Sequence, residues 1–313
     1  MLALASPASL KGVLSASAAA EALGEGFRAG GAVSELAPVA DGGEGTADVL
    51  AAVLGGQWHA ARVPDAFGAE HAARWLVLPD GTAVVEAAAA VPLDPARLDP
   101  FAASSRGFGE LVRHALGAGP RALVLCFGGT ATMDGGAGLR EVLEELPART
   151  VALCDVRTTL WEAPRVFGPQ KGASATDVAQ LERRLALMPE LVTYAELAGA
   201  GAAGGLGAAV AALGADLVGG AEWVLRAIGF RARLRRADLV VTGEGRVDAS
   251  TRAGKAPAAV AAAARAGRVR CVVFGGVVEA PLPGVQTVAL SGDPAAAEAD
   301  LRALGRDLVA QSN

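Results

Sequence analysis

Residues 2–39 of this chain, LALASPASLKGVLSASAAAEALGEGFRAGGAVSELAPV, decide its fold class. The segment 2–6 is short and apolar, which is typical of a buried strand. The segment 15–29 begins at a serine, a residue type that caps helix N-termini, and is predicted to be a helix. A second strand is predicted over 32–39. A strand, a helix and a strand in this order indicate a parallel sheet with helices on its faces.

The same alternation continues at both ends of the chain, while the middle differs. The middle contains a hairpin signal, Pro79-Asp80-Gly81, inside 58–91. We therefore predict an α/β protein of two α/β domains, a discontinuous Rossmann- or flavodoxin-like domain over 1–57 and 235–313, and an α/β domain over 58–234 inserted in it. The further predicted elements are helices over 46–54, 107–117, 139–146, 255–266 and 294–310, and strands over 122–127, 237–242, 269–274 and 286–290.

Composition excludes several classes of protein. The chain has 313 residues, is 52% hydrophobic and carries a net charge of −5, which argues against a general nucleic-acid or anionic-membrane surface. Its three cysteines show no C-x-x-C spacing, and its three histidines show no zinc spacing. The uncharged stretch 197–215 is mostly Gly and Ala, so we predict a loop and a buried helix there, not a membrane span. We expect a cytoplasmic protein without a signal peptide.

Lysine is scarce in this chain. Of its 28 basic residues only three are lysines, Lys11, Lys171 and Lys255, and each adjoins a glycine. A lysine ammonium on its flexible stem suits phosphate oxygens. The pattern indicates retained anion-binding sites, with chance in a glycine-rich chain as the alternative.

Three acid–glycine segments follow predicted strands, at 41–46, 127–138 and 242–248. A strand, a glycine turn and a helix together direct backbone N–H groups at an anion. Carboxylates beside such a turn can hold Mg²⁺ together with phosphate. In an open α/β sheet these turns mark the ligand-binding edge. The alternative is that they are ordinary tight turns and helix caps.

Other nucleotide motifs are absent or weak. No G-x-x-x-x-G-K-[ST] sequence occurs, because Lys255 is followed by an alanine. The segment 199–204 matches G-x-G-x-x-G after a predicted strand at 192–197, which leaves a nicotinamide-dependent oxidoreductase as an alternative.

Taken together, the glycine-flanked segments resemble the glycerate kinase family, in its bacterial form that phosphorylates the 2-hydroxyl of glycerate. The resemblance spans nearly the whole chain, in the family's order. The matching segments are PASLKG (7–12), VADGGEGT (39–46), GGTATMDGGAG (128–138), CDV (154–156), VFGPQKG (166–172), GAGAAGGLG (199–207), TGEGRVD (242–248) and AGKAP (253–257).

The resemblance implies a two-domain α/β enzyme with its active site in the cleft between the domains. It implies ATP as the phosphoryl donor, Mg²⁺ as cofactor, and glycerate as acceptor, giving 2-phosphoglycerate and ADP. A small-molecule substrate is then the expected partner, with no nucleic acid or membrane; a homodimer is left open.

Site residues follow from the matching segments. We expect four catalytic residues, Lys11, Asp41, Asp248 and Lys255. Nucleotide binding is assigned to Gly128, Gly129, Thr130, Lys171, Gly243 and Gly245. Substrate binding is assigned to Ser9, Asp134 and Asp155. The expected Mg²⁺ ligands are Asp41, Glu44 and Glu244.

The chain departs from the family at several of these segments. The family has an acid at Ala8, a serine at Val13 and an asparagine at Met133, and it continues differently at 157–159. Apolar side chains cannot hydrogen-bond a substrate hydroxyl or ligate Mg²⁺. The alternative is therefore a degenerate member, with an altered hydroxy-acid substrate or a binding-only role.

Overall fold

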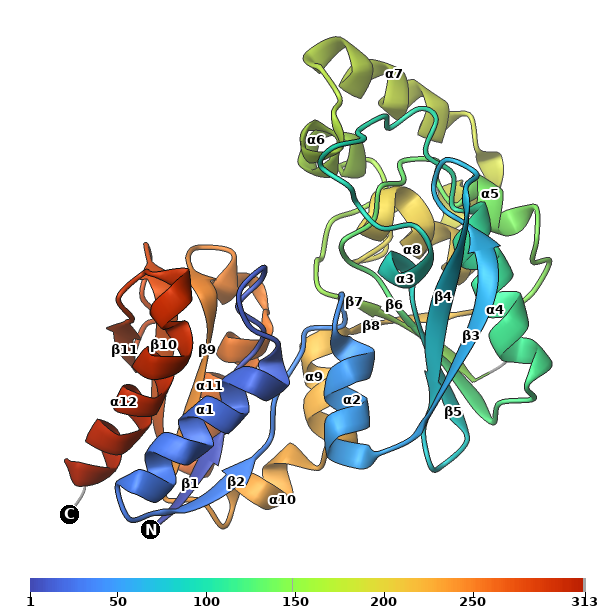
Figure 1. Cartoon of the computed structure of the whole chain (residues 1–313). Coiled ribbons are helices and arrows are strands. Elements are labelled where there is room, and N and C mark those ends of the chain that lie inside the picture. The colour runs from blue at the N-terminus through green and yellow to red at the C-terminus, as the bar shows by residue number, and fades with distance from the viewer. Residues whose placement is uncertain (148, 312–313) are drawn as a thin grey trace. The chain divides into compact units, whose positions relative to one another are not determined.

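The computed structural model describes residues 1–147 and 149–311. The chain forms two units, each with its own core. The first contains Met1–Asp41, Asp48–Val53 and Ala221–Asn313, and the second contains Gly42–Ala47 and Leu54–Gly220. In Figure 1 the first unit is therefore coloured from both ends of the chain, blue and orange to red. Residues 221–234, which were expected in the inserted domain, belong to the first unit. The expected domain limits at 57/58 and 234/235 stay a prediction.

The first unit is built on a parallel sheet. Within the described residues its strand order is β11-β10-β9-β1-β2, with every neighbouring pair parallel. Numbered along this unit alone, the order is 2-1-3-4-5, which is the flavodoxin-like order. The predicted flavodoxin-like α/β fold is thus confirmed. Its strands are β1 (Leu2–Ala5), β2 (Val33–Leu36), β9 (Leu239–Val247), β10 (Arg270–Val278) and β11 (Gln286–Ala289).

Helices α1 (Ala16–Ala29) and α12 (Ala297–Ala310) lie side by side on one face of this sheet (Figure 1). Ser15 caps α1, because its side chain accepts the Ala18 N–H. Alternate strand residues such as Ala3, Ala5 and Val241 fill the core beneath these helices. The unit also contains α9 (Gly220–Ala227), α10 (Phe230–Leu234), η3 (Thr251–Ala253), α11 (Ala256–Gly267) and η4 (Pro294–Ala296); α2 (Thr46–Leu54) falls mostly within it.

The second unit is built on a mixed sheet, ordered β3-β4-β5-β6-β7-β8. The β3, β4 and β5 strands are antiparallel, and the others continue in parallel. The predicted turn lies between β4 and β5, where Gly81 has φ +83° and the Asp80 side chain accepts the Thr82 N–H. The strands are β3 (Gln57–Pro64), β4 (Glu70–Val77), β5 (Thr82–Glu86), β6 (Ala122–Cys126), β7 (Thr150–Cys154) and β8 (Asp216–Gly219).

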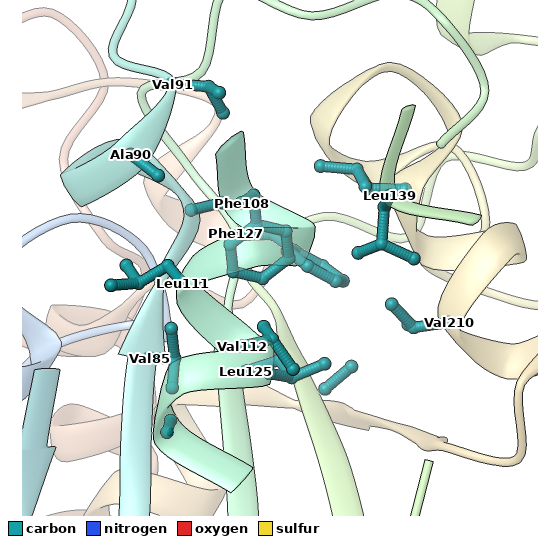
Figure 2. Packing of buried hydrophobic residues seen from close by; sticks show 14 of the residues in the cluster. Val85, Ala90, Val91, Phe108, Leu111, Val112, Leu125, Phe127, Leu139 and Val210 are labelled. Atoms are coloured by element: carbon teal, nitrogen blue, oxygen red, sulfur yellow. The ribbon is translucent and has the colours of Figure 1, made fainter. Parts of the chain in front are cut away.

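An apolar core joins this sheet to its helices (Figure 2). Phe108 and Phe127 meet edge-to-face with their ring centroids 6.1 Å apart, an arrangement that aromatic rings favour. The helical elements are α3 (Ala87–Ala90), α4 (Arg106–Gly117), α5 (Ala137–Arg140), α6 (Ala163–Phe167), η1 (Pro169–Lys171), α7 (Ala175–Ala186), η2 (Pro189–Tyr194) and α8 (Ala202–Ala212).

Three sequence-based predictions are wrong in detail. The expected strand over 192–197 overlaps the 3₁₀ helix η2, so the G-x-G-x-x-G segment lacks the preceding strand that a dinucleotide fingerprint requires. The expected helix over 139–146 is reduced to the single turn of α5. The expected turn over 242–248 is largely strand β9, which pairs with β10 as far as Val247.

The glycine-rich stretch 197–215 contains α8, whose interior carries left-handed residues at 203–205. No helix among the described residues is long and apolar enough to cross a membrane. The cysteines are free thiols, with Cys126 and Cys154 buried and Cys271 partly buried. Burial raises the pKa of Cys154 and of Cys271 to about 12, which favours the protonated thiol over the nucleophilic thiolate at neutral pH.

Candidate functional site

A cavity opens at the carboxyl ends of the strands in the first unit. Its volume is about 400 Å³, and residues that follow β1 and β11 line it together with residues of β9 and β10. In this sheet order the strand sequence reverses between β1 and β9, which is where α/β sheets bind ligands. The charged lining residues are Lys11, Glu244, Arg246, Asp248, Lys255, Asp293 and Asp300. Two lysines expected from sequence therefore share one cavity.

Glu244 interacts with several neighbouring groups of this cavity. Its Oε1 accepts a hydrogen bond from Thr251 Oγ1 at 2.8 Å, and its Oε2 lies 3.6 Å from Lys255 Nζ. Burial raises the pKa of Glu244, and the negative charge of Asp41 adds to this effect, while Thr251 and Lys255 oppose it. A carboxylate held with a second acid in a desolvated place favours a cationic ligand.

The pKa of Asp248 is shifted in the opposite direction from that of Glu244. Its Oδ1 accepts hydrogen bonds from Ser250 N at 2.7 Å and Ser250 Oγ at 2.5 Å. These bonds, the side-chain one first, lower the pKa of Asp248. The group therefore stays charged, but it is a weak base.

Lys255 is held at the start of a helix. It occupies the N-cap position of α11, and Pro257 at N2 favours helix initiation there. The Lys255 carbonyl oxygen accepts the Ala258 and Ala259 N–H groups, each at 3.1 Å, so the backbone of Lys255 is fixed by the first turn of the helix. Lys11 lies in the exposed turn after β1 and Ser9 lines the same cavity.

Gly243 and Gly245 do not form the expected anion-binding turn, because both lie within β9. Gly243 O accepts the Ala8 N–H at 2.8 Å. A Cβ at Gly243 would stand 2.3 Å from Phe274 O, so only glycine allows β9 and β10 to approach there. Their assignment to nucleotide binding stays a prediction.

Two buried hydroxyls are left without partners at this edge. Ser6 Oγ and Thr242 Oγ1 make no hydrogen bond in the described part of the chain. The register pairs Ala5 with Val241. The next residue on each side is Ser6, directly after β1, and Thr242, within β9, so these two residues are neighbours. Buried polar groups are nearly always satisfied, and orphaned hydroxyls here are consistent with a polar ligand at this edge.

In the second unit two glycine-rich segments are in close contact, one at Gly43 and Glu44 and the other at Gly128 and Gly129. A Cβ at Gly128 would lie 2.8 Å from Gly43 Cα, and one at Gly129 would lie 2.9 Å from Glu44 Oε2. The structure thus brings Gly43 and Glu44, of the segment 41–46 that the sequence singled out, next to the segment 127–138. Glu44 is exposed beside them.

Lys171 lies beneath the second of these segments. It is only 4% exposed, and its Nζ donates to Thr132 O at 2.8 Å and to Thr130 Oγ1 at 3.4 Å. Burial lowers the pKa of Lys171 to about 7, against the attraction of Asp134. Its ammonium is therefore engaged by the loop itself.

The Asp134 carboxylate also makes its hydrogen bonds within the second unit. Its Oδ2 accepts hydrogen bonds from Ser105 N, Ser105 Oγ and Gly138 N, at 2.8, 2.8 and 3.1 Å, and Oδ1 accepts one from Gly136 N at 3.1 Å. Four bonds fill a carboxylate's lone-pair positions. The geometry favours the capping interpretation over substrate binding. Asp155, half-buried after β7, contributes to raising the pKa of Cys154.

Sequence reasoning missed several residues of these clusters. Thr251 holds Glu244, and Ser105 holds Asp134, although each lies in a segment without a recognisable motif. Asp293 and Asp300 reach the cavity from the start of the last helix. The Asp293-Pro294 pair is typical of a helix start, and it is the one sequence signal that could have pointed to Asp293.

The chain is similar to known kinases over most of its length. The model of the glycerate kinase family matches residues 3–146 and 140–292. Glycerate 2-kinase from Escherichia coli (strain K12) is 37% identical over 307 residues, covering 83% of this chain and 81% of that protein. Glycerate kinase from Bacillus subtilis (strain 168) is 37% identical over 322 residues, covering 87% and 84%.

The similarity extends to three-dimensional structure. The crystal structure of a putative glycerate kinase 2 from Salmonella typhimurium LT2 superposes with a TM-score of 0.83 at 32% identity, covering 100% of this chain and 98% of that one. A family model over nearly the whole chain, relatives similar over most of their length and a shared fold agree. The chain belongs to the glycerate kinase family and is a kinase.

Proposed function

We propose that this kinase transfers the γ-phosphoryl group of ATP to the 2-hydroxyl of glycerate, giving 2-phosphoglycerate and ADP. The observation that carries the proposal is the grouping of Lys11, Glu244 and Lys255 around one cavity at the carboxyl edge of the first sheet. The names of the similar proteins, glycerate 2-kinase and glycerate kinase, supply the substrate.

Lys11 and Lys255 are proposed to neutralise the oxygens of the transferring phosphoryl group. Phosphoryl transfer depends chiefly on positioning and charge stabilisation. Two ammonium groups on one cavity supply that charge. Lys255, ion-paired with Glu244 at 3.6 Å, is held in place before the phosphate arrives. Ser9, on the same cavity, is proposed to bind the acceptor.

The carboxylates near the cavity suit Mg²⁺. Asp41 and Glu244 lie near enough for Asp41 to raise the pKa of Glu244, and a divalent cation would relieve that repulsion. Mg²⁺ takes one or two carboxylates together with substrate phosphates. When bound, the ion would neutralise phosphate charge.

The acceptor hydroxyl must lose its proton to a nearby base. Asp41 is proposed to accept it, because Asp248 is held at a low pKa by Ser250 and suits orientation of charge better than proton transfer. Glu44 as an additional Mg²⁺ ligand, and Gly128, Gly129 and Thr130 as nucleotide contacts, stay predictions.

The departures from the family motif bear on the acceptor. Val13 is exposed and lines the cavity, so it would contact a substrate. Met133 is fully buried against Ala163 and Leu181, where it serves packing. We propose that the first position tunes which hydroxy acid is bound, while the second does not.

The test is release of ADP from ATP and Mg²⁺ with D-glycerate, followed by incubation of the product with enolase. Enolase consumes 2-phosphoglycerate but not 3-phosphoglycerate. We expect glycerate-dependent ADP release and an enolase-competent product. Lys255→Met and Asp41→Asn should each lower kcat by ~100-fold or more, since each removes charge stabilisation or the base.

Arg183→Met on α7 is the matched control, because this exposed residue lies outside the cavity. It should retain full activity. A folded protein that releases no ADP with glycerate would overturn the acceptor. Full activity of both Lys255→Met and Asp41→Asn would overturn the residue roles.

A further inference from the structure

The arginine-rich segment 231–236 divides into two pairs with different surroundings. Arg233 Nη1 donates to Glu35 Oε1 at 2.7 Å, and Arg236 Nη2 donates to Glu35 Oε2 at 2.9 Å. Arg233 Nε also donates to Ile228 O at 3.1 Å. This pair ties α10 to β2 and has a structural role.

The other pair is Arg231 and Arg235, which lie about one helical turn apart. Both line a second cavity, separate from the one that contains Lys11 and Lys255. Arg226 of α9 lines the same cavity. All three are exposed. Within residues 1–147 and 149–311, none of these three guanidinium groups makes an ion pair or a side-chain hydrogen bond. One carboxylate, Glu222, also lines the cavity, so the net charge of the lining is positive.

The cavity lies against α9, α10 and α11 and has a volume of about 700 Å³. Leu225 and Phe230 provide its apolar lining from α9 and α10. From α11, one face provides only alanines, at 259, 262, 263 and 266, a spacing that puts them on the same side of a helix. Cavities of this size suit small organic ligands.

We propose that this α9–α10–α11 cavity is a second binding site, for an organic anion with an apolar body. Guanidinium groups bind carboxylate or phosphate oxygens through paired N–H donors. Three like charges beside one cavity repel one another, and an anion would relieve that repulsion. The alanine face offers apolar contact for the rest of the ligand.

This site is distinct from the cavity with the two lysines. The two cavities share no lining residue. They are connected through α11, because Lys255 caps its N-terminus and alanines further along the same helix line the second cavity. The inference does not depend on the substrate proposed above.

Two fluorescent probes with the same ring systems test the proposal. Anilinonaphthalene sulfonate carries an anionic group on an apolar body, and N-phenylnaphthylamine lacks the charge. We expect the intact protein to bind the sulfonate at least tenfold more tightly than the neutral amine. Arg231→Gln together with Arg235→Gln should weaken sulfonate binding about tenfold or more, as expected for loss of charged hydrogen bonds.

A matched double variant controls for net charge. Arg113→Gln together with Arg183→Gln removes two exposed arginines of the second unit and should leave binding unchanged. Ala263→Glu, which puts a carboxylate into the cavity, should also abolish sulfonate binding while leaving the melting temperature close to that of the parent. Equal binding of the two probes, or unchanged binding in the Arg231/Arg235 variant, would overturn the proposal.

Competition identifies the anionic group. Phenyl phosphate and benzoate should be added separately to the protein–sulfonate complex. Displacement by the phosphate alone would support a phosphate ester as the ligand, and displacement by benzoate alone would support a carboxylate. Displacement by neither would contradict an organic-anion site.

Discussion

Lys171 illustrates how burial changes a residue that looks catalytic in sequence. It adjoins a glycine, as the other two lysines do. Its Nζ nevertheless reaches Thr132 O and Thr130 Oγ1 in the loop above it. The side chain thus holds the loop 130–132 in this structure, and the assignment of Lys171 to nucleotide binding stays a prediction.

This burial predicts a pH dependence of stability. The pKa of Lys171 is lowered to about 7 in the folded protein, whereas it is near 10.5 when the chain is unfolded. Between these values the unfolded state binds more protons, so its contribution to stability rises with pH across that window and is lost as pH falls through 7. Urea unfolding from pH 6 to 10 should therefore show the parent gaining on Lys171→Met, by at most about 1.4 kcal/mol per pH unit.

The comparison with Lys171→Met separates this lysine from the other titrating groups. Below pH 6 the difference between the two proteins should be constant. A difference that falls with rising pH, or stays flat from pH 7 to 10, would show that Lys171 is not buried in this way.

At the scale of elements, the close approach of two helices depends on glycine. A Cβ at Gly26 of α1 would lie 2.2 Å from Arg302 O of α12, and one at Gly305 would lie 2.7 Å from Leu23 O. These contacts are with backbone atoms, which cannot turn aside as side chains can. The two helices can be in contact only because each has no side chain at the crossing.

Gly26→Ala and Gly305→Ala should therefore each destabilise the protein by about 1–3 kcal/mol, the usual range for overpacking. Urea unfolding measures this. Gly117→Ala is the control, because a Cβ at this helical position meets nothing within 4 Å. The control should be neutral or stabilising by up to about 1 kcal/mol. Equal effects at 26 and 117 would contradict the close crossing.

At the scale of the whole molecule, the two units have separate cores, so local damage should stay within one unit. Gly26→Ala should lower hydrogen-exchange protection in peptides from 1–41 and 221–311. Asp134→Asn should do so in peptides from 54–220, because an amide cannot accept all four bonds that the carboxylate accepts.

Exchange followed by mass spectrometry distinguishes the outcomes. Asp80→Asn serves as the control for Asp134→Asn, because within residues 1–147 and 149–311 the Asp80 side chain accepts one hydrogen bond, from the Thr82 N–H, and the substitution should change little. If either Gly26→Ala or Asp134→Asn lowered protection equally in both units, the units would unfold as one.

Much of the first unit's fold was predictable because its signals are local. A serine before one alanine-rich segment, a second alanine-rich segment and apolar strand runs placed α1, α11 and β1 within a few residues. The elements that differ are those in which local and tertiary preferences conflict. The glycines at 243 and 245 look like a turn in sequence, but pairing with β10 holds them in an extended strand. Likewise, the expected strand over 192–197 lies partly in the 3₁₀ helix η2, which ends at Tyr194 and packs against α8.

The sequence by itself determined the fold class, the family and the short set of charged residues worth testing, because strand periodicity, helix caps and glycine-flanked lysines are readable from neighbours along the chain. Only the tertiary structure decided which of those charges are accessible. Lys11 and Lys255 line a cavity while Lys171 is buried, and the Asp134 carboxylate is filled by its own turn, through Gly136 N and Gly138 N, and by Ser105, 29 residues away. The physical reason is that solvation and hydrogen-bond partners depend on residues distant in sequence. Glu35, for example, is 198 residues from Arg233. The arginines that pair with Glu35 have a structural role, whereas Arg231 and Arg235 are left facing solvent.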